Sequence, residues 1–488
     1  MMTRKAAKTK AKRIRVFAVC LIASVTLAAF SGCKFMETGE KYESVLSSDT
    51  SITTTSDSTS ATETTTTTTT EDDTTTSTTT TKTDTTPTTT KQTTTKATTK
   101  ATTKPTTAST TKATTKATTT ATTKATTATT QGETHSFASK ADESLMYGYS
   151  KLTGSEKKLY TTLLNGISAH KSSITITASS TDSVSRAYSA MIGDHPEIFY
   201  TTGKLVFIGL KTMVSTVEVE YAYTASQTEQ MNKEIEAVAS AILSKISVNA
   251  SSFEKLKIIH DSIILGCDYS YTGSNLHNLY GALVEGKSVC EGYAEAFQYL
   301  SQRVGVMTLA VTGDVGVEGH MWNMVRLENE FYHIDPTHDD PPGSEKDYIQ
   351  YDYFNLTTAE ILQTRTISPY YDSATKSWLN YYEIPNSTAT KYNYFNYKGL
   401  NFSSYDSVAA QGLQNEISNA VLAGRHNIFI RFSSADAYTA AFNSLNKNGE
   451  VFTLIDNATA DMPTFSLKGV YTSVEQTDFN IMWIYLNY

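Results

Sequence analysis

Cysteine is scarce in this chain. Only four cysteines occur among its 488 residues, and two of them, Cys20 and Cys33, fall in an N-terminal segment that is not expected to belong to the fold. A folded region that holds just Cys267 and Cys290 is not a disulfide-stapled scaffold. A single bridge between Cys267 and Cys290 remains open, and it would give both sulfur atoms a structural role.

A basic stripe is also lacking. The formal net charge is -8, and the folded region has no run of Lys and Arg that could neutralise a series of phosphates. These features exclude nucleic acid as an expected partner. The one dense basic cluster, Arg4 to Arg15, directly precedes the apolar run Val16 to Phe30, which is the order found in a secretion signal.

The apolar run ends in Phe30-Ser31-Gly32-Cys33. Small residues followed by cysteine resemble a lipoprotein signal, whose cleavage leaves Cys33 as the lipidated N-terminus, although Phe30 departs from the usual aliphatic residue. The alternative is an uncleaved signal anchor, but the run is shorter than the roughly 20 apolar residues that span a bilayer. We expect an extracellular protein at the cell surface, anchored to the membrane by a lipid on Cys33.

Apolar residues are nearly absent between about Ser47 and Thr130, where threonine dominates. Burial in such a segment cannot offset the entropy of ordering it, which predicts an extended spacer. The expected parts of the chain are a signal peptide with its lipidation site (1–33), a Thr-rich linker (34–138), an N-terminal α+β region (139–250), a central core (251–370) and a C-terminal α+β region (371–488).

Mixed helical and strand periodicity beyond the linker predicts an α+β fold. Ser155 can cap a helix in which apolar residues recur at helical spacing from Leu159 to Ile167. Further elements are expected as helices at Val184–Met191, Met231–Ile246 and Phe253–Leu265, and as a strand at Val217–Tyr223. The part from about Asn415 to Tyr488 resembles a small α+β appendage and has no chemical motif.

Cys290 directly precedes a helical pattern of apolar residues, so we expect it at a helix N-terminus. The partial positive charge of a helix N-terminus favours the thiolate, which is the nucleophilic form of cysteine. The alternative for an isolated cysteine is an inert, buried thiol. Three strands should follow the helix, the last two joined in a hairpin at Glu328: Met307–Thr312, His320–Leu327 and Phe331–Asp335.

Nucleophilic catalysis by cysteine also needs a base and a group that orients the base. His320 opens one strand of the hairpin and Asp335 closes the other, so we expect the two side chains to meet. An acidic loop at Thr337–Asp340 could instead hold a cation through oxygen ligands. Three other histidines compete for the role of base, namely His260, His277 and His333.

Three sequence blocks resemble the transglutaminase-like superfamily of bacterial exported proteins. They are Ser288–Phe297 (SVCEGYAEAF), Gly319–Val325 (GHMWNMV) and Phe331–Thr337 (FYHIDPT). The resemblance implies a papain-like core with the catalytic cysteine at a helix N-terminus packed on an antiparallel sheet. It makes Cys290 the nucleophile, His320 the base and Asp335 the group that orients the base. It extends upstream to Asp194–Tyr200, and one departure is His338, where members commonly have tryptophan.

The resemblance implies a cysteine enzyme that transfers acyl groups at amide bonds without a cofactor or a metal. The expected partner is a protein, peptide or cell-wall peptide substrate, and the acceptor is either water, as in a peptidase or amidase, or an amine, as in cross-linking. The oxyanion hole should use the Cys290 backbone N–H and a second donor, for which Tyr269 and Tyr271 are candidates. The rival hypothesis is a non-catalytic module of the same fold that binds a protein or glycan.

Overall fold

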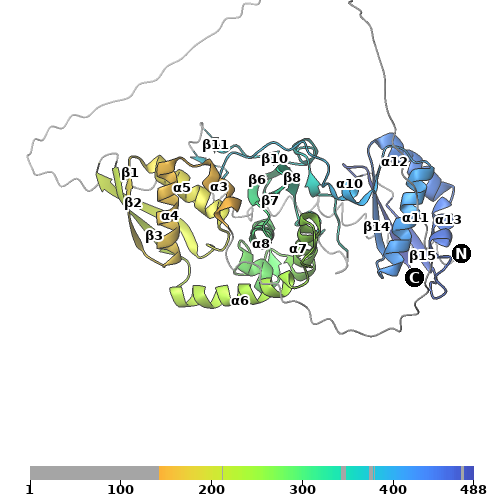
Figure 1. Cartoon of the computed structure of the whole chain (residues 1–488), viewed down its shortest axis with the longest axis horizontal. Coiled ribbons are helices and arrows are strands. Elements are labelled where there is room, and N and C mark those ends of the chain that lie inside the picture. Colours follow the sequence, from red (N-terminus) through yellow and green to blue (C-terminus); the bar gives the residue numbers. More distant parts are fainter. Residues whose placement is uncertain (1–141, 211–212, 342–347, 373–376, 379, 474–476) are drawn as a thin grey trace, which may run out of the picture. The chain divides into compact units, whose positions relative to one another are not determined.

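The computed structural model describes residues 142–210, 213–341, 348–372, 377–378, 380–473 and 477–488 (Figure 1). The signal segment, Cys33 and the Thr-rich linker lie outside the described residues, so export, lipidation and the spacer remain predictions. Within the described ranges, every helix is too short or too polar to cross a membrane.

The first part of the described chain builds an antiparallel sheet in the order β1-β3-β2. Leu163, Met191 and Val217 are fully buried between this sheet and its helices. The elements are η1 (Glu143–Leu145), α3 (Tyr147–Lys151), α4 (Gly154–Ser168), β1 (Ser173–Ala178), α5 (Thr181–Asp194), β2 (Thr201–Leu210), β3 (Met213–Tyr221) and α6 (Ala225–Leu243). The helices and the strand expected here from periodicity are present.

The start of α4 differs from the expectation that Ser155 caps it. Thr153 is the cap: its side chain accepts a hydrogen bond from the Glu156 N–H, and the Glu156 carboxylate accepts one from the Thr153 N–H at 3.0 Å. Thr153 caps the helix in place of Ser155 because it lies three residues before a glutamate, which is the spacing of a capping box. Ser155 lies inside the first turn of the helix.

A five-stranded sheet in the order β10-β6-β7-β8-β9 forms the centre of the next part, and its strand pairs are antiparallel. The strands are β6 (Thr308–Val315), β7 (Glu318–Leu327), β8 (Glu330–Ile334), β9 (Phe354–Leu356) and β10 (Thr366–Ile367). The expected hairpin is confirmed, because Leu327 pairs with Glu330 across a turn in which Glu328 and Asn329 have φ of 49° and 70°. Positive φ at both central residues is the geometry of the tight turns that suit antiparallel strands.

Helix α8 (Cys290–Arg303) packs on β6 and β7 of this sheet (Figure 1). Phe297 of α8 and Trp322 of β7 are both fully buried, and they belong to the same hydrophobic core cluster. The preceding elements are α7 (Ser252–Gly266), β4 (Asp268–Tyr269), the π-helical turn η2 (Gly281–Glu285) and β5 (Lys287–Ser288). The expectation of a helix on an antiparallel sheet is therefore confirmed.

The C-terminal part has a four-stranded sheet in the order β13-β14-β16-β15. Its elements are α10 (Tyr394–Lys398), β13 (Asn401–Phe402), α11 (Ser407–Leu422), β14 (Asn427–Phe432), α12 (Ala435–Phe442), η3 (Asn443–Lys447), α13 (Glu450–Thr459), β15 (Gly469–Thr472) and β16 (Ile481–Asn487). In the chain, α9 (Thr358–Ile361) lies between β9 and β10, and the two-stranded sheet of β11 (Tyr371–Asp372) and β12 (Ser377–Trp378) follows β10. The whole is an α+β fold, as expected, while the domain boundaries at 250 and 370 remain predictions.

Candidate active site

Cys290 is the first residue of α8, as predicted, and its side chain is buried with 2% exposure. The chain is held tightly just before it: the Ser288 hydroxyl and the Val289 N–H both donate to the Leu276 carbonyl, at 2.5 and 3.0 Å. Gly292 permits this packing, since a Cβ there would lie 2.0 Å from the Ser288 hydroxyl oxygen. The thiol is therefore presented from a rigid helix start.

The two described cysteines are not joined by a disulfide, which removes the alternative of a Cys267–Cys290 bridge. Cys267 lies at the end of α7 and is 3% exposed. Burial raises the pKa of the Cys267 thiol to about 12, so this sulfur is unreactive at neutral pH.

His320 and Asp335 meet, as the hairpin predicted. The Nε2 atom of His320 lies 2.8 Å from Oδ2 of Asp335, and both side chains are buried. An ionised carboxylate only accepts hydrogen bonds, so the imidazole donates from Nε2 and Nδ1 is the nitrogen that can accept the proton of a thiol. Cys290 and the β7 residue Met321 belong to the same buried cluster, and the Asn323 amide donates to the Ala294 carbonyl at 3.1 Å, which ties β7 to the first turns of α8.

The electrostatic setting keeps His320 neutral. Burial lowers the pKa of His320 to about 4, and the attraction of Asp335 opposes this shift without reversing it. Burial alone would raise the pKa of Asp335, but His320, His338 and Arg365 outweigh it and hold that pKa well below its usual range. At neutral pH the pair is thus a neutral imidazole beside an ionised carboxylate.

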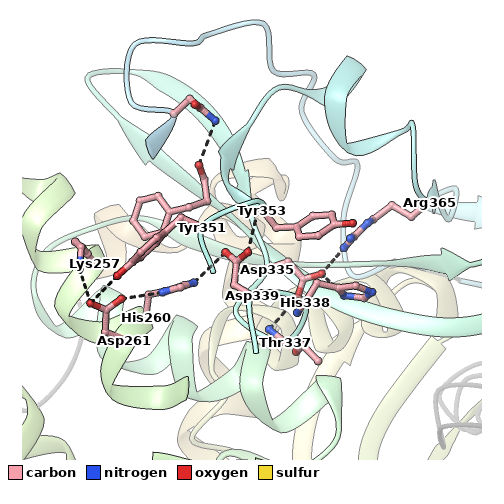
Figure 2. Close-up of polar contacts among 12 residues, drawn as sticks. Lys257, His260, Asp261, Asp335, Thr337, His338, Asp339, Tyr351, Tyr353 and Arg365 are labelled. Carbon is pink, nitrogen blue, oxygen red and sulfur yellow. Dashed lines mark hydrogen bonds and ion pairs between the residues drawn. The ribbon is translucent and has the colours of Figure 1, made fainter. Parts of the chain in front are cut away.

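Arg365 is a site residue that sequence reasoning missed. Its Nη1 contacts Oδ2 of Asp335, and neither side chain is exposed (Figure 2). The guanidinium also lies against two aromatic rings, 4.4 Å from the centroid of Tyr353 and 5.3 Å from that of Trp322. A lone arginine just before β10 has no spacing that links it to Asp335, so only the fold identifies it.

All three residues of the proposed triad fall within residues 236–336, which match the family model of the transglutaminase-like superfamily. Residues 236–336 are a transglutaminase-like core. The resemblance found in the three sequence blocks is thereby confirmed. No curated protein matches the chain.

Several solved structures are similar to parts of the chain. A TGase matches at 12% identity over 30% of this chain and 46% of that one, with a TM-score of 0.22. A candidate cysteine protease from Cytophaga hutchinsonii matches at 18% identity over 26% and 52%, with a TM-score of 0.19. A candidate protease from Parabacteroides distasonis matches at 10% identity over 27% and 35%, with a TM-score of 0.17. The chain spans about half of these structures or less, and scores this low assign no activity.

The competing histidines of the transglutaminase-like core have other partners. His333 accepts at Nδ1 from the Trp322 indole at 3.1 Å, its Nε2 lies 3.1 Å from the Thr358 hydroxyl, and burial lowers its pKa to about 3. His277 pairs with Glu291 at 3.0 Å. None of these contacts involves Asp335, which leaves His320 as the histidine of the three sequence blocks that Asp335 orients.

The third competing histidine, His260, lies in a separate buried network (Figure 2). Its Nε2 is 3.1 Å from Asp339 and its Nδ1 is 3.1 Å from Asp261. Asp339 also accepts from the Tyr353 N–H at 3.0 Å, while Asp340 accepts from the Tyr293 hydroxyl at 2.7 Å. The carboxylates of the acidic loop therefore point to different partners, which does not favour the suggested cation site there.

The residue that departs from the family pattern, His338, lies at the site itself. Its Nδ1 is 2.9 Å from Oδ2 of Asp335, the oxygen that His320 and Arg365 also contact. The ligating atoms of His320, Asp335 and His338 lie within 4.8 Å of one another, close enough to suggest a metal. However, the permanent charge of Arg365 on the same oxygen would repel a divalent cation. We interpret the cluster as hydrogen bonds and an ion pair that converge on the Asp335 carboxylate, and we assign no metal to it.

Proposed function

We propose that the chain is a surface-anchored, transglutaminase-like cysteine enzyme that transfers acyl groups at amide bonds through Cys290, His320 and Asp335. The observation that carries the proposal is the buried His320–Asp335 pair, 2.8 Å apart, in which His320 lies on β7, the strand against which the Cys290 helix packs, and Asp335 directly follows β8. The family match over residues 236–336 supports the same assignment. The lipid on Cys33 and the location at the cell surface belong to the proposal and rest on the signal-like N-terminal sequence.

The reaction begins with transfer of the Cys290 thiol proton to Nδ1 of His320 as the sulfur attacks a carboxamide or peptide carbonyl carbon. The backbone N–H of Cys290 donates to the developing oxyanion, because helix-start amides carry partial positive charge. Protonated His320 then gives its proton to the leaving amine, the C–N bond breaks, and a thioester remains. Asp335 stabilises the imidazolium in between.

Two acceptors complete the cycle with the same residues. Water attacks the thioester to give a carboxylic acid, as in a peptidase or amidase, whereas a primary amine gives a new amide, as in protein cross-linking. In both cases His320 takes a proton from the acceptor and returns it to the Cys290 sulfur. The proposed substrates are proteins, peptides or cell-wall peptides, and Tyr269 and Tyr271 remain candidates for the second oxyanion donor.

Incubating the full chain with a mixture of glutamine-containing peptides, with and without a primary amine, tests the proposal. We expect mass changes in the peptides that correspond to deamidation, cleavage or amine incorporation. Mass spectrometry of the mixture distinguishes the three, and the yield with amine relative to that without it identifies the acceptor. Peptides of unchanged mass in both mixtures, across glutamine and cell-wall peptides alike, would count against acyl transfer.

A non-catalytic binding module is the second candidate, and the 2% exposure of Cys290 favours it. Labelling with iodoacetamide at neutral pH separates the two. Because Cys267 is equally buried but has a strongly raised pKa, an activated Cys290 should react faster by about tenfold or more. His320→Ala should remove that advantage. Equally slow labelling of both thiols in the unaltered chain would support the binding module.

A further inference from the structure

Two imidazoles share one carboxylate oxygen in this site. His320 approaches Oδ2 of Asp335 at 2.8 Å and His338 approaches it at 2.9 Å. The two rings meet edge to face, with centroids 4.5 Å apart and an angle of 87° between their planes. Only His338 has appreciable contact with solvent, since its side chain is 29% exposed and that of His320 is 7% exposed.

We propose that His338 is a positioning residue that regulates His320: proton uptake by His338 draws Asp335 away from His320 and weakens His320 as the base for Cys290. The inference rests on the proposed function for its effect on catalysis. His338 is the more exposed of the two imidazoles, so it can exchange protons with solvent directly while His320 stays buried.

Two physical effects act in the same direction. A charged donor makes a stronger hydrogen bond to a carboxylate than a neutral one, so protonated His338 takes a larger share of the Oδ2 acceptor. It also places a positive charge beside the His320 ring, which disfavours a second positive charge there. In agreement, a positive charge on His338 lowers the pKa of His320, as does that of Arg365.

The groups around His338 leave Asp335 as its direct charge partner. Asp335 lies on the same loop and its Oδ1 accepts from the His338 N–H at 3.3 Å. His320 faces the His338 ring from β7. Tyr353, in the segment before β9, has its ring centroid 5.2 Å from that of His338. Arg365 and His338 both contact Oδ2 of Asp335, so the charge of Arg365 affects His338 through this carboxylate. Since Arg365 is permanently charged, His338 is the group whose change of charge can alter the balance at Asp335.

The rate of Cys290 alkylation as a function of pH in the full chain tests the proposal. We expect the unaltered chain to lose rate in two steps on the acid side, because two coupled imidazoles act on the carboxylate that orients the base. His338→Gln, which keeps a polar side chain, and His338→Phe, which keeps an aromatic ring beside Tyr353, should each show a single step, that of His320. His195→Gln is the matched control, because it breaks an imidazole–carboxylate pair with Glu197 in the N-terminal part and should keep both steps. Superimposable profiles for the unaltered chain and both His338 variants would overturn the inference.

A second measurement does not depend on catalysis. In the full chain labelled with ¹⁵N-histidine, the imidazole signals of His320 report its own titration. Removing the neighbouring charge should raise the titration midpoint of His320 by more than about 1 pH unit in both His338 variants, which is the size of coupling that separates two interacting sites. An unchanged midpoint would refute the inference even if the enzyme is active. A raised midpoint in a chain without acyl transfer would refute only the proposed function.

Discussion

Cys290→Ser is expected to abolish acyl transfer, with a loss in kcat on the order of a millionfold, as when the nucleophile of a catalytic triad is removed. A serine hydroxyl beside a neutral imidazole is a much weaker nucleophile than a thiol, because far less of it ionises. Stability should change little, since Cys290 is not in a disulfide and serine is of similar size. Turnover of a peptide that the unaltered chain converts, together with the thermal midpoint of unfolding, measures both effects.

Cys267→Ser is the matched control for this variant. Cys267 is also reduced and equally buried, but it directly follows α7 and its sulfur lies 3.8 Å from the Asp268 carbonyl oxygen. The control should keep its turnover and show a similarly small change in thermal midpoint. If Cys290→Ser lowered the midpoint far more than Cys267→Ser did, the Cys290 sulfur would have a structural role.

The second large effect is expected for Asp335→Asn, which should lower kcat by about 10⁴-fold, the order seen when the orienting carboxylate of a triad becomes an amide. An amide can donate to His320 and thereby favour the wrong tautomer, and it no longer stabilises the imidazolium. Substrate affinity should change much less than kcat. Steady-state kinetics measures the two separately, and unaltered turnover would remove Asp335 from the mechanism.

Asp335→Asn should also destabilise the fold, by about 3–5 kcal/mol, because it leaves the buried Arg365 charge without its partner. The pKa of Asp335 is held well below its usual range in the fold, so the stability it contributes is present above the unfolded pKa of about 4 and is lost as pH falls through the lower folded pKa. Urea unfolding of both forms at several pH values should show their difference shrinking in acid. A difference that stays constant down to the acid limit would contradict this assignment.

Asp339→Asn is the control that separates the loss of kcat from the loss of folding stability. Asp339 is a fully buried carboxylate on the same loop, and it pairs with His260 at 3.1 Å, whereas Asp335 pairs with His320. Its replacement should lower the free energy of unfolding while largely preserving kcat. A loss of kcat equal to that of Asp335→Asn would mean that both variants act through general disorder of the loop.

Features that depend on neighbours in the sequence could be predicted. The helix that begins at Cys290 and the hairpin turn at Glu328 follow from apolar spacing and from a short polar turn, and the hairpin brings His320 to Asp335. The cap of α4 shows the limit of such reasoning. Apolar spacing predicts the helix, but its cap is Thr153 and not Ser155, because Thr153 and Glu156 form reciprocal hydrogen bonds.

Features that depend on the closed fold could not be predicted. The two-residue strand β10 has no periodicity to detect, yet its pairing with β6 places Arg365 near Asp335. His338 stood out only as a departure from the family pattern, and nothing in its spacing showed that its ring shares an oxygen with His320. Partners in a buried ion cluster are chosen by three-dimensional packing, to which sequence distance is a poor guide.

The contact between Arg365 and Asp335 bears on where the working unit of this protein ends. Arg365 lies beyond the last residue of the family match at 336, separated from it by β9 and α9. A fragment trimmed to the matched segment would carry the proposed nucleophile, the proposed base and its carboxylate. It would lack the Arg365 cation that pairs with that carboxylate, and it would lack both edge strands of the sheet, β9 and β10. The proposed site therefore depends on residues up to Ile367, beyond the segment that matches the family model.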